Sequence, residues 1–445
     1  MIHLKIMQII SLETLIYILS ILFSLTYFFN ESIANTFIRI AFFLGLIQLL
    51  KNKQIKINWI FYKKYLFPIF IFFISLFFSL FFSINFCNSI LTYESFLKTL
   101  IPFFTILLYI NGKAKICTLF IFLLIGFLSN DIFAIYNYFH FNYTRVGGFN
   151  NQVITLAGML LLHIPLILSL LIKSKFKSIY TLILFSALII SLLTLIFNAT
   201  RMAWFIIIID FIILNFLLIK SWKNKFAIFI TIIISIITLY SFNSNINDRI
   251  NTLFNYNNVS TRGHYYYLRD GFNIFLNNNY WGIGLNNFQE VMLSNSYLSA
   301  ESKQNLQHDG AVKIGNNLVM SHAHNDFIMF LVESGVIGGL AYIYFFITLI
   351  YLLLKNYFIT NNIICLGMLL LTINLLIRGL SDYNFAMLNV ITIYFFILSI
   401  YLKYLTSMKY FCNTIKIYSY KNIIYLYISI IFIILLRIFS RYFLT

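Results

Sequence analysis

The chain has 445 residues, of which 61% are hydrophobic and 10% are charged, and its formal net charge is +18. This apolar share is far beyond that of a soluble domain, so an ordinary globular fold is excluded. Apolar runs of roughly 17 to 25 residues recur along the chain, which is the length that a helix needs to cross a bilayer. The period-two alternation typical of barrel strands is missing. The sequence therefore predicts an all-α, polytopic integral membrane protein.

Twelve spans are predicted. The first has no small-residue cleavage site and is longer than the apolar core of a signal peptide, so we expect it to be retained. A later apolar run, residues 423–439, is a thirteenth span or an interfacial helix, because Arg437 and Arg441 interrupt its end. The twelve predicted spans are residues 9–29, 33–50, 65–84, 96–110, 118–139, 152–172, 179–197, 203–219, 226–243, 326–354, 363–379 and 386–405.

Lysines set the predicted orientation. They gather in short loops near residues 51–64, 113–115, 173–177 and 220–225, which all lie on one side of the membrane if the spans alternate. This is the positive-inside pattern, so the excess charge sets the topology and implies no nucleic-acid partner. The predicted segments are membrane helices at 1–243, one large periplasmic loop at 244–325, membrane helices at 326–405, and a basic cytoplasmic segment with a possible extra helix at 406–445.

Arginines are distributed differently from lysines. The planar guanidinium suits bidentate binding of phosphate, whereas the ammonium of lysine acts as a point charge. The pattern therefore suggests a phosphate-bearing substrate on the outer side, and scattered surface arginines are the alternative. Those on or near the predicted outer face are Arg145, Arg201, Arg249, Arg262, Arg269 and Arg378.

Two carboxylates lie inside predicted spans and are further candidate functional residues. Asp131 and Asp210 fall inside predicted spans, where ionisable groups are functional suspects, and they favour the alternative of a proton-coupled transporter or flippase. Against that alternative, the other polar candidates gather at the outer face, whereas transporter sites lie near the midplane.

The cysteines have no Cys-x-x-Cys spacing, so neither a zinc site nor a disulfide framework is predicted. They are Cys87, Cys117, Cys365 and Cys412.

The stretch from 321 to 339 joins the long loop to an apolar helix. It begins with hydrogen-bonding or titratable residues, which is typical of a helix start at a membrane surface: Ser321, His322, His324, Asn325 and Asp326. An imidazole there could take a proton from an attacking hydroxyl, so His324 is the candidate general base, and a merely solvated histidine is the alternative. A metal shared with His322 is not predicted, because a two-residue offset points two side chains to different sides of a helix.

Glycines follow in the same stretch. Gly335, Gly338 and Gly339 lie about one turn apart if the segment is helical, which predicts close approach of a neighbouring backbone. Read from His324, the chain gives His-Asn, nine residues, Gly335, two residues and Gly338. This spacing resembles the motif shared by bacterial O-antigen ligases, O-antigen polymerases and O-oligosaccharyltransferases. In that family the motif likewise lies where the large periplasmic loop enters a membrane helix.

Three more stretches resemble the same family, so the resemblance covers roughly residues 145–389. Arg201 stands in ATRMAW at the outer end of a span, and RVGGFNNQ contains Arg145 and Gln152. Arg262 precedes by about twenty residues a turn with the pattern Gly-x-Gly-x-x-x-Phe, made by Gly282, Gly284 and Phe288. One departure is Tyr280-Trp281 before this turn, where relatives commonly carry a proline.

The resemblance implies a glycosyltransferase at the periplasmic face of the bacterial inner membrane. It would move a glycan from undecaprenyl pyrophosphate to a sugar hydroxyl of lipid A-core during lipopolysaccharide assembly, inverting the anomeric carbon and needing neither metal nor cofactor. A polymerase or a protein O-oligosaccharyltransferase would use the same donor. The departing pyrophosphate needs fixed positive charge where negative charge develops. The sequence leaves the oligomeric state open.

Residue roles follow from the matching positions. The resemblance implies that His324 is the catalytic base and that Arg201, Arg262 and Arg145 bind the donor pyrophosphate. Asp382 matches an acidic position of the ligases and could orient His324 or Arg262, with a structural salt bridge as the alternative. The predicted supporting residues are Asn325, His322, Asp382 and Gln152.

Overall fold

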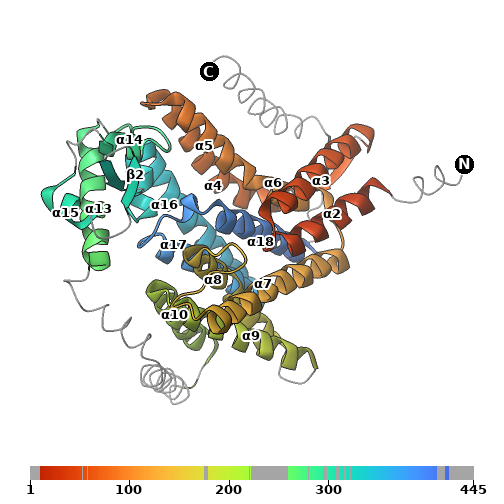
Figure 1. Ribbon diagram of the computed structural model, residues 1–445. Helices are drawn as coiled ribbons and strands as arrows, with labels where there is room; N and C mark the ends of the chain where they lie inside the picture. Colours follow the sequence, from red (N-terminus) through yellow and green to blue (C-terminus); the bar gives the residue numbers. More distant parts are fainter. Residues whose placement is uncertain are drawn as a thin grey trace, which may run out of the picture. The chain divides into compact units, whose positions relative to one another are not determined.

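The computed structural model is helical along most of its length, as predicted (Figure 1). It describes residues 11–52, 54–57, 59–174, 179–219, 221, 259–278, 280–293, 298–306, 311–314, 317–320, 322–407 and 416–419. The predicted span at 226–243 and the apolar run at 423–439 lie outside these residues. Within the described part, nine helical stretches are long and apolar enough to cross a membrane, and two shorter apolar helices accompany them. Each of the eleven coincides with a predicted span.

The amino-terminal half supplies helices that follow one another closely. Phe61–Phe82 and Phe86–Tyr109 are membrane-length stretches that each join two elements. The helices are α2 (Leu12–Thr26), α3 (Glu31–Asn52), α4 (Trp59–Phe78), the 3₁₀ turn η1 (Ser79–Phe82), α5 (Phe86–Lys98), α6 (Leu100–Tyr109), α7 (Lys113–Phe141), α8 (Val153–Lys173), α9 (Ile179–Asn198) and α10 (Arg201–Leu218).

The carboxyl-terminal half contains the predicted outer loop and the last membrane helices. In the described part of the loop, short helices and a hairpin are formed, so it has secondary structure of its own. The helices are α13 (Val259–Asn277), α14 (Phe288–Leu293), α15 (Ala300–Leu306), α16 (Asp326–Thr360), α17 (Ile363–Arg378), the 3₁₀ turn η2 (Asn384–Ala386) and α18 (Leu388–Thr406).

Short strands modify the all-α prediction. β2 (Ala311–Ile314) pairs antiparallel with β3 (Asn317–Met320), and this hairpin ends just before His322. β1 (Gln54–Ile57) pairs antiparallel with β4 (Lys416–Ser419). Each strand has four residues, which is too short for the apolar periodicity of the sequence to reveal.

The chain divides into two compact units. One combines Met1–Phe73, Asn85–Asn130 and Met387–Thr445, and the other combines Ile74–Ile84 with Asp131–Ala386. In the first unit α2 packs against α3, and α6 packs against α18 and α3. In the second unit α17 packs against α8, α16 and α10, and α13 packs against α16. Every predicted site residue belongs to the second unit.

Two adjacent asparagines separate α16 from α17. Asn361 has a left-handed φ of 47° and closes α16, a conformation that asparagine tolerates better than most residues. The side chain of Asn362 accepts a hydrogen bond from the backbone N–H of Ile364 and so begins α17. The two long helices can therefore reverse direction within a short turn.

The carboxylates inside the predicted spans are hydrogen-bonded between helices of the second unit. Asp131 on α7 lies 2.9 Å from His163 Nε2 on α8 and accepts a 2.8 Å hydrogen bond from Ser191 on α9. Asp210 on α10 accepts a 2.8 Å hydrogen bond from Asn374 on α17. Partners of this kind hold helices together where water is excluded. These contacts fit a structural role for both carboxylates, and the transporter alternative built on them stays a prediction.

Candidate active site

The site lies between the β2–β3 hairpin and the start of α16. Asn325 is the residue that caps the helix: its Oδ1 accepts a 3.0 Å hydrogen bond from the N–H of Ile328, and its Nδ2 donates to the carbonyl of Leu380 at 3.0 Å. His324, one residue earlier, has a left-handed φ of 51°. Histidine is among the few residues enriched in this conformation. The predicted helix start is therefore found, and the chain bends sharply just before it.

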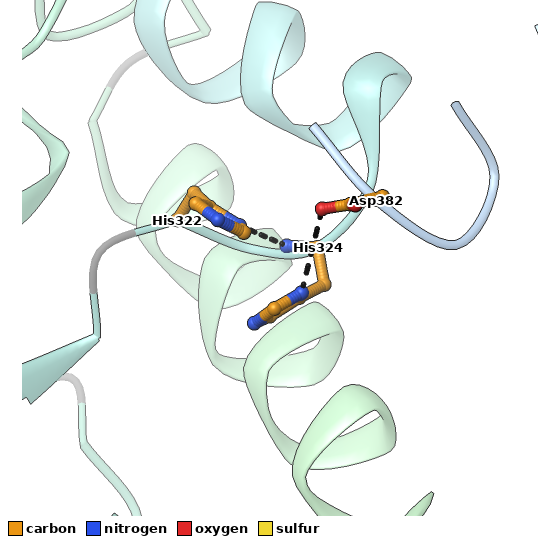
Figure 2. A group of neighbouring side chains, drawn as sticks. All are labelled: His322, His324 and Asp382. Atoms are coloured by element: carbon orange, nitrogen blue, oxygen red, sulfur yellow. Dashed lines mark hydrogen bonds and ion pairs between the residues drawn. The ribbon is translucent and has the colours of Figure 1, made fainter. Parts of the chain in front are cut away.

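This bend brings two histidines and a carboxylate together (Figure 2). The ring centroids of His322 and His324 are 4.2 Å apart, and Nδ1 of His322 accepts a 3.2 Å hydrogen bond from the backbone N–H of His324. Nδ1 of His324 lies 3.8 Å from Oδ1 of Asp382. The His324 side chain is 25% exposed, so a substrate can reach the ring. Asp382 thus lies beside His324, and its 3.7 Å ion pair with Arg378 fits the alternative of a structural salt bridge equally well.

Helix α13 contributes two further rings. The centroid of His264 is 4.6 Å from that of His324, and the Tyr267 ring stacks on His324 at 5.7 Å with an interplanar angle of 25°. His264 and Tyr267 are three residues apart, so they project from one face of the helix. Sequence reasoning missed both of them. The signal that could have found them is their three-residue spacing, which puts both rings on one face of the helix that also carries Arg262.

Burial keeps the two histidines of the bend uncharged. The pKa of His324 is lowered to about 2, mainly by burial and also by the neighbouring His322 and His264 rings. Burial likewise lowers the pKa of His322, an effect that the Asp382 carboxylate partly offsets. Both imidazoles are therefore neutral near pH 7, and each carries one ring nitrogen that can accept a proton or a hydrogen bond.

Asp382 is itself held in place by the loop after α17. Its Oδ1 accepts a 2.8 Å hydrogen bond from the N–H of Tyr383, and its Oδ2 lies 3.7 Å from Nη2 of Arg378. Arg378 is buried and donates from Nη2 to the carbonyl of Ile154 at 2.9 Å. Among the described residues, Arg378 at the end of α17 is therefore the arginine that pairs with the Asp382 carboxylate.

Asp326 connects the start of α16 to the same loop. Its backbone N–H donates to the carbonyl of Gly379 at 2.7 Å, and its buried carboxylate accepts from the backbone N–H and side-chain Nδ2 of Asn384 at 2.7 and 2.8 Å. The hydroxyl of Tyr342 donates to it at 3.1 Å. A side chain at Gly379 would collide with it, since a Cβ there would lie 2.4 Å from Oδ2 of Asp326. Asp326 thus fixes the segment that carries Asp382 against the segment that carries His324.

The glycines of the two sequence motifs meet at a kink in α16. Gly335 has φ 68° and ψ −169°, which is not helical, and a Cβ on it would lie 2.5 Å from the backbone of Trp281. A Cβ on Gly282 would in turn lie 2.5 Å from the backbone nitrogen of Gly335. The predicted close approach of a backbone therefore occurs at Gly335. Around Gly338 and Gly339 the nearest atoms belong to α16 itself.

Hydrogen bonds join the turn to the kink. Ile283 N–H donates to the carbonyl of Val332 at 2.9 Å, and Gly284 N–H donates to that of Glu333 at 2.9 Å. In the other direction, Val336 N–H donates to the carbonyl of Tyr280 at 3.0 Å. The departure from the family at Tyr280-Trp281 is compatible with this arrangement, because these two residues contribute backbone atoms to it.

The three predicted arginines lie on separate elements of the second unit. Arg145 donates from Nη2 to Thr200 Oγ1 at 3.1 Å and from Nε to the carbonyl of Asn198 at 3.4 Å, and so it contacts the turn that precedes Arg201. Arg201 begins α10. Arg262 lies on α13 two residues before His264, and its Nε is buried without a hydrogen-bond partner among the described residues.

Gln152 stands at the beginning of α8. Its Oε1 accepts a 2.8 Å hydrogen bond from Thr155 Oγ1, one turn further along the helix. This contact is local to α8, and the predicted supporting role of Gln152 stays a prediction.

Comparison with known families locates the matching segment. Residues 186–343 match the model of a family described as O-antigen ligase. The predicted resemblance is confirmed over this segment, which contains Arg201, Arg262, the turn at 280–288 and the stretch from His322 to Gly339. No curated protein matches the chain. The O-antigen ligase domain and the apolar helices together support a multi-pass membrane glycosyltransferase of the ligase or polymerase type.

Proposed function

We propose that this protein transfers a glycan from undecaprenyl pyrophosphate to a sugar hydroxyl of lipid A-core at the periplasmic face of the bacterial inner membrane. The observation that carries the proposal is the position of His324, a neutral and reachable imidazole at the start of α16, within the O-antigen ligase domain and 3.8 Å from the carboxylate of Asp382. Access, a free lone pair and an orienting partner are what a general base needs from geometry. The Asp382 carboxylate stabilises the imidazolium that forms when the proton arrives, against the burial that lowers the pKa of His324.

In the proposed reaction the acceptor hydroxyl gives its proton to His324. The hydroxyl oxygen forms a bond to the anomeric carbon while the bond from that carbon to the pyrophosphate oxygen breaks, and its electron pair leaves with the lipid pyrophosphate. Asp382 faces Nδ1 of His324 and favours a proton on that nitrogen, so Nε2 is the atom that accepts. A single displacement of this kind inverts the anomeric carbon.

The departing pyrophosphate gains negative charge, which fixed positive charge stabilises. We assign this task to Arg201 and Arg262, and the unpartnered Nε of Arg262 supports the assignment because it is a donor ready for an anionic oxygen. Arg145 contacts the turn before Arg201. We therefore propose that Arg145 positions Arg201, in addition to any direct contact that it makes with the donor.

The test is the variant His324→Ala in a strain that lacks the native gene. We expect long glycan on lipid A-core to disappear while the protein remains in the membrane at wild-type levels. His140→Ala is the matched control, because His140 is an exposed histidine of the same unit at the end of α7. Wild-type amounts of glycan on lipid A-core in the His324→Ala strain would refute the catalytic role.

The same deletion strain separates the acceptors. Loss of long glycan from lipopolysaccharide with the lipid-linked polymer retained identifies a ligase. Single-unit glycans identify a polymerase, and loss of glycan from protein identifies an O-oligosaccharyltransferase. Product formation by purified protein in detergent, with no gradient and with a chelator present, excludes a role in transport alone.

A further inference from the structure

The His322, His324 and Asp382 cluster has the composition and the size of a metal site. Each residue offers one ligand atom, and these three atoms lie within 4.8 Å of one another. The argument from helical geometry does not apply to the two histidines, because both precede α16 and the left-handed residue 324 turns their rings together. Figure 2 shows the three side chains converging from two segments of the chain.

The ligand set selects the class of ion. Two imidazoles and one carboxylate suit Zn²⁺ and neighbouring transition metals, whereas Mg²⁺ and Ca²⁺ prefer oxygen ligands. Tetrahedral Zn²⁺ with bonds of about 2.1 Å separates its ligand atoms by about 3.4 Å, so the cluster has to contract by roughly 1 Å or a little more. Side-chain rotation of His322 provides this movement, at the expense of its 3.2 Å hydrogen bond from the backbone of His324.

The surroundings hold two of the ligands ready. Asp382 is fixed by the N–H of Tyr383 at 2.8 Å, and Arg378 approaches its other oxygen at 3.7 Å. The Tyr267 ring lies against His324 and restricts its orientation. Such contacts orient the ligand side chains before the ion binds. They raise the affinity of a metal site because the ligands then lose less conformational freedom on binding. A fourth position stays open to water or to a substrate oxygen.

We propose that His322, His324 and Asp382 form a binding site for Zn²⁺ that inhibits glycan transfer. The ion binds Nδ1 of His324, the nitrogen that faces Asp382, and the one ring proton then lies on Nε2, which can no longer accept the proton of the acceptor hydroxyl. Binding of the ion does not depend on the proposed function, whereas inhibition rests on it. The ion therefore regulates the proposed reaction by occupying its base, and it takes no part in the glycan transfer itself.

Metal binding is tested directly with the purified full-length protein in detergent. Co²⁺ is titrated and followed by its visible absorption, and Zn²⁺ is then added as competitor. We expect one saturable site in the wild type and in His140→Ala, and affinities lower by about tenfold or more in His322→Ala and Asp382→Asn, since each loses a ligand. The site would be overturned if the wild type showed no saturable binding. It would also be overturned if both ligand variants bound Co²⁺ with the affinity of the wild type.

Inhibition is tested with purified lipid-linked donor and acceptor. Zn²⁺ should inhibit wild-type transfer with a midpoint equal to its dissociation constant, an excess of chelator should restore the rate, and Mg²⁺ should have no such effect. Relative to its own metal-free rate, His322→Ala should need at least about tenfold more Zn²⁺. Saturating Zn²⁺ without inhibition overturns the regulatory proposal and leaves the transferase intact. A protein without transfer in the absence of metal contradicts the proposed function, and the Co²⁺ titration still decides the site.

Discussion

His324 is positioned by residues on both sides of it. Asn325 anchors the following helix turn, Asp382 faces one ring nitrogen, and Tyr267 lies against the ring. Its left-handed backbone conformation brings His322 alongside, which a straight helical reading of the segment excludes. The sequence therefore predicts the base and its acidic neighbour, since both lie in recognisable segments. It does not predict the pairing of the two histidines, because one backbone angle decides it.

Arg262 gives a prediction at the residue scale. Arg262→Lys keeps the positive charge and loses the planar fork, so the turnover with lipid-linked donor should fall at least about tenfold. Arg269→Lys is the matched control, seven residues later on the same helix. Arg269 already contacts Asp270 and Glu301, and a lysine there should leave transfer nearly unchanged. Unaltered turnover in Arg262→Lys would show that this arginine is structural.

The element that distinguishes this fold is the interrupted helix α16. Its predicted span is present, but the predicted uniform helix is broken at Gly335, where the turn at 280–284 replaces helical hydrogen bonds by bonds from another segment. Glu333 reinforces the junction, because its carboxylate accepts a 2.9 Å hydrogen bond from the N–H of Asn286. Hydropathy predicts where a span lies, and it carries no information about a partner more than forty residues away.

Gly335→Ala tests the kink. The backbone conformation of Gly335 is one that essentially only glycine adopts, and the new Cβ would meet the backbone of Trp281 at 2.5 Å. Strain and overpacking together should cost about 2 to 6 kcal/mol of stability, measured as a lower unfolding temperature in detergent.

The control for that variant is Gly112→Ala. Gly112 also has a positive φ, 98°, but a Cβ there would meet nothing within 4 Å. It should therefore show the cost of strain alone, about 1 to 3 kcal/mol. Equal losses in the two variants would mean that the contact with the turn adds nothing.

At the scale of the whole molecule, topology is what the sequence predicts most fully. Charge asymmetry between loops predicts that the amino terminus and the lysine-rich loops lie in the cytoplasm, and eleven predicted spans coincide with helices of the described part. The division into two compact units was not predictable, because it depends on contacts between helices distant in the chain. The buried partners of Asp131 and Asp210 were not predictable either, because each partner lies on another helix.

Helix α7 offers a direct test of the orientation. It has 29 residues, which is about 43 Å of helix, so both ends should leave a hydrocarbon core of about 30 Å. With the four native cysteines replaced by serine, His140→Cys should react with an impermeant maleimide in intact spheroplasts. Lys113→Cys, exposed at the other end of the helix, should react only after permeabilisation. The reverse labelling pattern would invert the topology and place His324 in the cytoplasm.

The junction between the 280–284 turn and the α16 kink also limits how this protein can be recombined with its relatives. The two segments exchange main-chain hydrogen bonds at van der Waals contact, so neither tolerates a foreign counterpart of different shape. A chimera that imports only one of them should misassemble even if every residue near His324 is retained. Residues 280–288 and 332–336 therefore behave as one exchangeable module, and a chimera should take both pieces from the same relative.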